Sequence, residues 1–248
     1  MNMKNLKRIL KKHSGRRSGK VTVRHQGGRS KRFLREVDFK RDKISVWGTV
    51  EVIEYDPNRN ARLALVLYED GERRYILCPD GVEVGSKVIA SESAPIEVGN
   101  TLAMGIIPVG AQIHNLEVRP GKGGQMVKSA GSVAAVFGKE DDWVLVKLPS
   151  GEIRRFDPKA RATIGQVGNI EAKNRIFKKA GTKRNMGIRP SVRGTAMHPN
   201  SHPHGGGEGR SGVGMKYPKT VYGRRAVGKT RTKNKYSDRM IVERRGKK

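Results

Sequence analysis

The positive charge of this 248-residue chain is concentrated at its two ends. Residues 1–33 hold 12 Lys and Arg and no acid, and residues 171–248 hold 22 basic and 4 acidic residues. The middle, 34–170, has 18 basic and 19 acidic residues and is nearly neutral. Both ends are rich in glycine and poor in large apolar residues, so neither can bury enough apolar surface to offset the entropy lost on ordering. We therefore expect a globular centre with two extended basic arms.

The formal net charge of +29 points to a polyanionic partner, because a compact body with this charge repels itself. Nucleic acid is the expected partner of such glycine-spaced arms. An arm without a core of its own becomes ordered only when it lies along a surface that supplies negative charge. An anionic membrane surface is the alternative, but it requires an amphipathic apolar stripe, which the sequence lacks. No segment approaches the ~18 apolar residues of a membrane span. The sequence therefore favours a nucleic-acid partner and no membrane.

Cys78 is the single cysteine, which excludes an intramolecular disulfide and any multi-cysteine metal site. It ends the apolar run at 75–78, and this position predicts a small buried side chain rather than a reactive thiol. One cysteine without a partner also fits a reducing, intracellular setting.

The neutral middle has the pattern of short β-strands separated by turns. In its first part, alternating and β-branched residues predict strands at 44–55, 62–67, 74–77 and 88–90. Asp70-Gly71 lies between two of these runs and predicts a hairpin. In its second part the predicted strands are 102–107, 112–118, 132–137, 143–148 and 152–156. Helical periodicity is limited to 3–12 and 168–176.

Short strands at this spacing predict an all-β fold, either one sandwich or two small barrels. We favour two barrels, with a seam near 95–100. The expected division is a basic amino-terminal arm at 1–33, a first barrel at 34–97, a second barrel at 98–170, and a basic, glycine-rich carboxy-terminal extension at 171–248.

Three histidines and a glutamate in the carboxy-terminal extension are residue types that can bind a metal ion. They suggest a rival hypothesis, in which the chain is a metal-assisted hydrolase or transferase. The residues are His198, His202, His204 and Glu208. Proline follows His198 and His202 directly and pushes both towards extended backbone, so the imidazoles would splay along the chain. Zinc needs three or four ligands that converge from a packed scaffold. We therefore predict no metal, no cofactor and no small-molecule substrate.

The glycine runs at 121–125 and 205–209 lack the Gly-Lys-Ser/Thr ending of a phosphate-binding loop. Gly205, Gly206 and Gly207 instead predict close approach, because backbone amides without side chains can press against phosphates or sugars. His202 and Arg210 would flank that contact. No nucleophile, base and orienting acid are recognisably arranged, so the sequence does not predict an enzyme.

Several motifs together resemble those of a known family. They are Glu-Tyr-Asp-Pro-Asn-Arg at 54–59, Asp-Gly-Glu-Arg-Arg-Tyr-Ile-Leu at 70–77, Ile-Pro-Val-Gly at 107–110, Pro-Gly-Lys-Gly-Gly-Gln at 120–125, Ser-Gly-Glu at 150–152, Val-Arg-Gly-Thr-Ala-Met at 192–197 and His-Pro-His-Gly-Gly-Gly-Glu-Gly-Arg at 202–210. In this order they resemble the second protein of the large ribosomal subunit in its bacterial form. The resemblance covers about residues 20–248.

This resemblance implies an OB-fold barrel followed by an SH3-like barrel, with both arms buried in ribosomal RNA. It implies three partners, namely large-subunit ribosomal RNA, neighbouring ribosomal proteins, and the small subunit at the intersubunit face. It also implies roles in subunit association, tRNA placement and assembly of the peptidyl-transferase region. The expected location is the ribosome in the cytoplasm, and a plastid or other organelle stays open as the host.

By motif position, the resemblance implies that Arg59 and Lys128 contact RNA from the globular body and that His202 lies nearest the catalytic RNA. Lys128 stands at a position where arginine is common in that family. Lysine offers a phosphate a single point charge, whereas the guanidinium of arginine can donate two parallel hydrogen bonds. His202 is either a proton shuttle or, as we favour, a stacking and hydrogen-bonding contact. The full set of predicted RNA contacts is Arg59, Lys122, Lys128, Arg193, His202, His204, Gly205, Gly206, Gly207, Arg210, Arg224 and Arg225.

Overall fold

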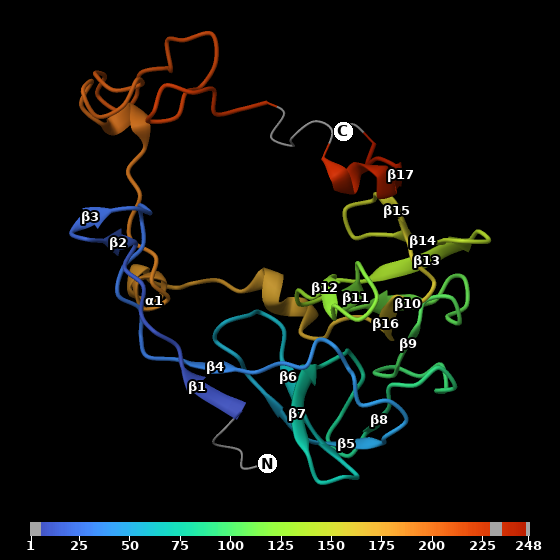
Figure 1. Ribbon diagram of the computed structural model, residues 1–248. Helices are drawn as coiled ribbons and strands as arrows, with labels where there is room; N and C mark the ends of the chain where they lie inside the picture. Colours follow the sequence, from blue (N-terminus) through green and yellow to red (C-terminus); the bar gives the residue numbers. More distant parts are fainter. Residues whose placement is uncertain (1–5, 229–234, 247–248) are drawn as a thin grey trace. The chain divides into compact units, whose positions relative to one another are not determined.

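The computed structural model describes residues 6–228 and 235–246, and its regular structure is almost entirely β (Figure 1). The all-β fold class expected from the sequence is thereby confirmed. The chain divides into two compact units. Among the described residues, the first unit contains 6–10, 31–176 and 237–246, and the second contains 11–30, 177–228 and 235–236.

The first barrel of the first unit is built on a four-stranded antiparallel sheet. Its strands are β5 (Gly48–Glu54), β6 (Leu63–Tyr68), β7 (Arg73–Leu77) and β8 (Lys87–Val88), in the order β7-β6-β5-β8. The predicted hairpin at Asp70-Gly71 joins β6 to β7, and Leu67 pairs with Arg73 at its end. Strand β5 is shorter than the predicted 44–55, because the chain before it bridges to Ala90 instead of to β6.

Strand β6 carries the core of this barrel on both of its faces. Ala64 and Val66 pack in one apolar cluster with β5 and β8, whereas Leu63 and Leu65 pack in another with Tyr75. Successive side chains of a strand point to opposite faces, so a continuous apolar run fits a strand that is covered on both sides. This strand is therefore the centre of the first barrel.

The second barrel is built on a seven-stranded antiparallel sheet. Its strands are β9 (Thr101–Ala103), β10 (Gln112–His114), β13 (Ala134–Lys139), β14 (Val144–Lys147), β15 (Ile153–Phe156), β16 (Arg161–Ile164) and β17 (Ile241–Glu243), in the order β17-β15-β14-β13-β10-β16-β9. One apolar cluster fills its interior, and Leu102, Met104, Ile113 and Val146 are almost completely buried in it.

The predicted strand at 112–118 is interrupted at Asn115. Asn115 has a φ of 51°, in the left-handed region, and the chain turns there into a separate hairpin of β11 (Leu116–Glu117) and β12 (Gly124–Met126). A Cβ on Gly124 would lie 2.0 Å from Oδ1 of Asn115, so only glycine fits at this crossing. The carboxylate of buried Glu117 accepts hydrogen bonds from the amides of Gly123 and Arg161 and fixes the hairpin to β16.

The helix predicted at 3–12 is wrong in its described part. Residues 3–5 lie outside the described residues, and Lys7–Ile9 forms strand β1, which pairs with β4 (Phe33–Arg35). Leu6 is buried in the cluster that contains Tyr75, so pairing and burial override the helical pattern. The other predicted helix, at 168–176, is the 3₁₀ segment η2 (Ile170–Asn174).

The second unit has no apolar core in the part of it that the structure describes. Its regular elements are β2 (Arg16–Arg17), β3 (Lys20–Val21), α1 (Ala180–Asn185) and η3 (Gly194–Ala196). The buried side chains of the structure that are apolar all belong to the first unit, while Arg29 is buried in the second. Turns and backbone hydrogen bonds, such as Gly27 N–H to the carbonyl of Gly187 at 2.9 Å, hold this unit together.

No described helix is long and apolar enough to cross a membrane.

Candidate nucleic-acid interface

Two of the predicted RNA contacts, Arg59 and Lys128, meet over one aromatic ring. Cζ of Arg59 lies 5.6 Å and Nζ of Lys128 lies 4.2 Å from the ring centroid of Phe39. Arg59 belongs to the turn between β5 and β6 of the first barrel, whereas Lys128 follows β12. Cation–π attraction to this ring contributes to the position of both groups. We call Phe39, Arg59 and Lys128 the cation seat.

Buried Asp56 orients the guanidinium of Arg59. Its Oδ2 accepts a hydrogen bond from Nε of Arg59 at 2.8 Å, and its Oδ1 accepts from the backbone N–H of Asn58 at 3.0 Å. The Asp56 side chain is 0% exposed, and that of Arg59 is 22% exposed. One carboxylate thus fixes both the turn and the cation, and the unused N–H groups of Arg59 remain for a ligand.

Asn60 ties the turn that carries Arg59 to the segment that carries Lys128. Its Oδ1 accepts a hydrogen bond from the N–H of Ala130 at 3.2 Å, and its carbonyl accepts from Nδ2 of Asn169 at 2.6 Å. All of these residues lie in the first unit. The two cations are therefore held at their spacing before any ligand binds.

The cation seat contains two positively charged side chains, and the neighbouring Asp56 carboxylate supplies one negative charge. Burial lowers the pKa of Lys128, and repulsion by the nearby Arg59 guanidinium lowers this pKa further. Among the described residues, no carboxylate lies within ion-pair distance of Lys128. An anion placed against both groups would relieve this repulsion, and a phosphate oxygen is such an anion.

Lys122 lies near the cation seat, but in a different electrostatic setting. It lines a groove of about 500 Å³ that also includes Phe39 and Arg74. Acids share this groove, because Arg74 forms ion pairs with Asp38 at 3.0 Å and with Glu72 at 2.9 Å. The charges in the groove are largely balanced, so we expect Lys122 to contribute less to anion binding than the cation seat.

In the second unit, the predicted histidines hydrogen-bond to the backbone of their own segment. Nδ1 of His202 accepts from the N–H of His204 at 3.0 Å, and Nε2 of His204 accepts from the N–H of Lys219 at 2.8 Å. The two rings also contact each other, with centroids 4.7 Å apart. The accepting nitrogens must be unprotonated, so neutral His202 carries its proton on Nε2.

The metal site weighed as a rival hypothesis does not form in the described part of the chain. There, no three His, Cys, Asp or Glu side chains are grouped as a metal ion requires. Nδ1 of His198 accepts from the N–H of Asn200 at 3.3 Å, while Glu208 is exposed. The imidazoles that would bind a metal are therefore engaged in turns.

The glycine run at 205–207 is required by crowding within the segment itself. A Cβ on Gly205 would lie 2.5 Å from the carbonyl oxygens of Met197 and His198, and one on Gly207 would lie 2.3 Å from Oγ of Ser211. The turn at 197–206 closes by a hydrogen bond from the N–H of Gly206 to the carbonyl of Met197 at 3.2 Å. The glycines are thus needed for the fold of this segment, and their predicted close approach to RNA stays a prediction.

The predicted arginines of the second unit are exposed around this turn. Guanidinium Cζ of Arg225 lies 5.1 Å from the ring centroid of Tyr217, and the carbonyl of Arg224 accepts from the N–H of Thr220 at 2.7 Å. Arg193 reaches the carbonyl of Gly209 at 3.5 Å, and Arg210 is exposed. The structure therefore collects these residues in one unit with His202 and His204.

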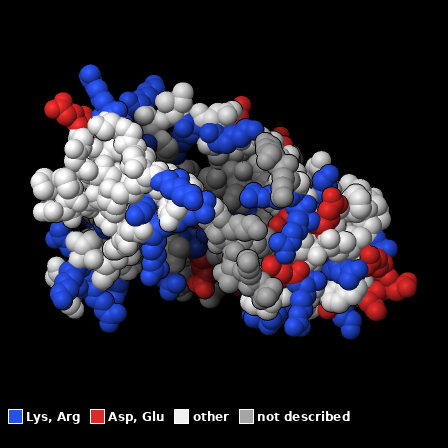
Figure 2. Space-filling view, turned by 90° about the horizontal axis from the view of Figure 1, so that it is seen from above, with Lys and Arg blue, Asp and Glu red and all other residues white. Residues whose placement is uncertain are grey.

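Most of the net charge of the chain belongs to the second unit. Its residues, 11–30 and 177–236, include 22 Lys and Arg and a single acid, Glu208. In Figure 2, blue Lys and Arg side chains stand with few red acids on the second unit, whereas blue and red mix over the first. A unit of this composition requires counter-charge, which a phosphate backbone supplies along its length.

Sequence reasoning missed Phe39 and the orienting roles of Asp56 and Asn60. All three contribute to the position of Arg59, and two of them stand in or beside the motif at 54–59. An Asp-Pro-Asn turn that ends in arginine is a signal for an oriented cation. Phe39 carries no such signal, because only the folded chain places it between the barrels.

Two small β-barrels with a cation seat, together with a coreless basic unit, define an RNA-binding protein of the ribonucleoprotein class. Comparison with known families gives the same answer in more detail. Residues 3–90 match the family described as Ribosomal Proteins L2, RNA binding N-terminal domain, and residues 97–223 match Ribosomal Proteins L2, C-terminal domain.

The chain therefore belongs to the ribosomal protein L2 family. It is a ribosomal protein of the large subunit that binds ribosomal RNA and serves in translation. The expected OB-fold and SH3-like barrels are those of the family's two domains.

Proposed function

We propose that the cation seat and the basic second unit together hold large-subunit ribosomal RNA in its folded form. Through this contact the chain supports subunit association at the face of the small subunit, tRNA placement and assembly of the peptidyl-transferase region. Its role is structural and not enzymatic. The predicted division at 34–97 and 98–170, with extensions on both sides, is part of this proposal.

The observation that carries the proposal is the meeting of Arg59 and Lys128 over Phe39. Each cation comes from a different barrel, and both are held in place by contacts within the protein. A site that is built in advance loses little entropy on binding. The repulsion between its two cations favours the phosphate of a nucleic acid over a neutral group.

The tautomer of His202 supports a contact role for this residue. With Nδ1 occupied by the N–H of His204, the neutral ring offers its Nε2–H as a donor to a base or a phosphate. A proton shuttle would have to exchange this proton with a second group held in place. We therefore propose that His202, with Arg193, His204, Arg210, Arg224 and Arg225, binds RNA and does not take part in the peptide-bond step.

The test is the salt dependence of RNA binding by the full-length chain carrying Lys128→Met. Each phosphate that a cation neutralises contributes roughly 0.7 to 0.9 to the slope of log affinity against log salt. We expect Lys128→Met to reduce the slope by about one such contribution, because no acidic group of the described residues pairs with Lys128 and neutralises it. Lys147→Met, in the exposed position that ends β14, is the matched control and should leave the slope unchanged.

Equal slopes for the two variants and the unmodified chain would contradict the cation seat as an RNA contact. A complex that is insensitive to salt altogether would contradict the wider proposal, since phosphate binding by Lys and Arg releases counterions.

A further inference from the structure

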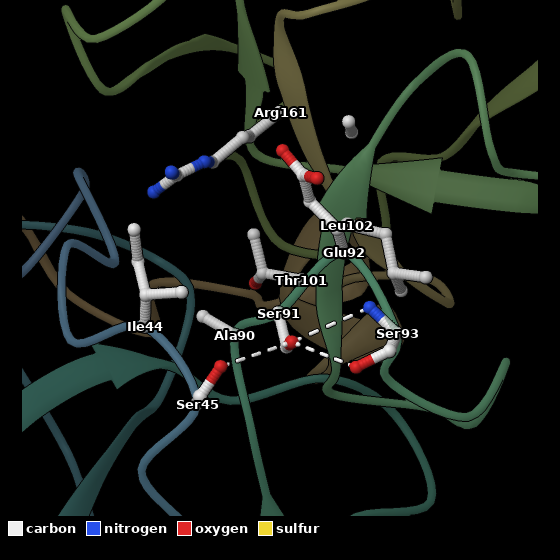
Figure 3. A pocket seen from close by; sticks show the side chains of 10 residues that line it. Ile44, Ser45, Ala90, Ser91, Glu92, Ser93, Thr101, Leu102 and Arg161 are labelled. Atoms are coloured by element: carbon white, nitrogen blue, oxygen red, sulfur yellow. Dashed lines mark hydrogen bonds between the residues drawn. The ribbon is translucent and has the colours of Figure 1, made fainter.

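A second cavity lies at the seam of the two barrels and contains no residue of the cation seat. Its volume is about 380 Å³, within the range of small-ligand pockets. Four stretches of the first unit form it, namely 44–45, 90–93, β9 and Arg161 of β16 (Figure 3). Neither the sequence motifs nor the RNA contacts proposed above involve this cavity.

Paired backbone holds the cavity in its shape. The N–H of Ser45 donates to the carbonyl of Ala90 at 2.8 Å, and the N–H of Ser91 donates to that of Thr101 at 3.1 Å. Arg161 pairs with Ala103 in the ladder between β16 and β9. The site is thus already formed before a ligand binds, so binding does not have to order the chain.

One part of the lining is apolar and another is a chain of hydroxyls. Ile44 is 52% exposed although it is a large apolar residue, and Ala90 and Ala103 also line the cavity. Oγ of Ser91 lies 3.2 Å from Oγ of Ser45 and 3.2 Å from Oγ of Ser93. A planar, amphipathic ligand fits such a lining, because its face can contact the apolar side chains while its edge bonds to polar groups.

Two opposite charges complete the site. In Figure 3 the side chains of Arg161 and Glu92 stand at one end of the cavity, and the three serines stand at the other. One N–H of Arg161 donates to the carbonyl of Arg41 at 3.3 Å, which leaves its other donors for a ligand. Glu92 is exposed and has no ion-pair partner in the described chain. Its carboxylate disfavours a bare phosphate at this site.

We propose that this cavity binds an unpaired purine base of the RNA, and guanine in preference to adenine. The Watson–Crick edge of guanine has one acceptor, O6, beside two donors, N1–H and N2–H. The guanidinium of Arg161 donates to O6, and the carboxylate of Glu92 accepts from both donors. Adenine offers the carboxylate only its amino group. This inference rests on the proposed function, because it assumes that the chain meets RNA.

Free nucleosides test the site without any phosphate. The full-length chain is titrated with guanosine, inosine and adenosine, and the amide shifts of Ser91, Ser93 and Ala103 are followed by NMR. Inosine differs from guanosine only by the missing amino group. Inosine cannot form the hydrogen bond from N2–H to the charged carboxylate, so we expect it to bind about tenfold more weakly than guanosine.

The variant Glu92→Gln supplies the second half of the test. Its amide oxygen is a weaker acceptor than the carboxylate, so the difference between guanosine and inosine should nearly vanish, while the exposed position leaves folding unchanged. Equal binding of guanosine and inosine by the unmodified chain, or no shift at these amides, would overturn the inference. The salt slope of RNA binding is measured on the same samples, and a normal slope with no nucleoside binding would refute the base site alone.

Discussion

At the scale of single residues, the cation seat depends on side chains that position the cations but are not proposed to contact RNA themselves. Asp56 is fully buried, and its two oxygens bond to the turn at Asn58 and to the guanidinium of Arg59. The resemblance to a family suggested Arg59 as a contact, but it gave no reason for its position. That reason is a buried carboxylate, and its contribution can be measured separately from that of the cation.

We expect Asp56→Asn to weaken RNA binding about threefold to tenfold without removing any positive charge. The amide cannot accept both bonds as a carboxylate does, so Arg59 loses its orientation, and the lost charge-assisted bond costs on the order of 1.5–3 kcal/mol of stability. Asp157→Asn is the matched control, because Asp157 accepts a backbone N–H at 2.8 Å in a similar turn that carries no predicted contact. Unchanged binding by the Asp56 variant would show that Arg59 needs no orientation.

His114 makes the stability of the first unit depend on pH. Burial lowers the pKa of His114 from its ordinary 6.5 to about 4, and the charge of Arg41 adds to this effect. The unfolded chain therefore takes up a proton below pH 6.5, whereas the folded chain does so only near pH 4. The contribution of His114 to stability is complete above pH 6.5 and is lost as the pH falls towards 4, by on the order of 3 kcal/mol in all.

The measurement is urea unfolding at pH 7.5 and pH 5, followed by the fluorescence of Trp47 and Trp143. In His114→Asn the side-chain amide can still donate to the carbonyl of Gly165, as Nδ1 of His114 does at 2.8 Å, but it does not titrate. We expect the unmodified chain to lose more stability at pH 5 than the variant, by about 2 kcal/mol. Equal losses would mean that other groups cause the pH dependence.

At the scale of elements, the sequence predicts the strands and turns that depend on residues close together in the chain. The hairpin at Asp70-Gly71 and strand β6 follow from alternation, β-branching and turn residues. The break at Asn115 and the strand at Lys7–Ile9 could not be predicted, because both depend on partners distant in sequence. For the same reason, the motifs named Arg59 and Lys128 but could not place them over Phe39.

Gly124→Ala tests the crossing at which the β11–β12 hairpin meets Asn115. The added Cβ would overlap Oδ1 of Asn115, so we expect a loss of about 2–4 kcal/mol in the free energy of unfolding. Gly138→Ala in β13 is the control, because among the described residues its Cβ would have only Leu145 within 4 Å, at 3.9 Å. We expect this control to stay within about 1 kcal/mol of the unmodified chain by urea unfolding. Similar losses for both variants would contradict the crowding at Asn115.

At the scale of the whole molecule, the two units differ in what stabilises them. The first unit has three apolar clusters and mixed charges, so it can fold without a partner. The second unit has 22 basic residues and one acid, and its described residues bury no apolar side chain. Its turns bring His204, Lys219 and Arg225 together by hydrogen bonds of the backbone and of the His204 imidazole, and water competes for such bonds.

Amide hydrogen exchange, with and without large-subunit RNA, tests this division most directly. In the free protein we expect the amides of β5, β6 and β7 to be protected and those of 193–228 to exchange at nearly unprotected rates. When RNA is bound, the amides of 193–228 should become protected, while those of the first barrel change little. Strong protection of 193–228 in the RNA-free protein would contradict the account, because that segment would then hold its structure without a phosphate scaffold.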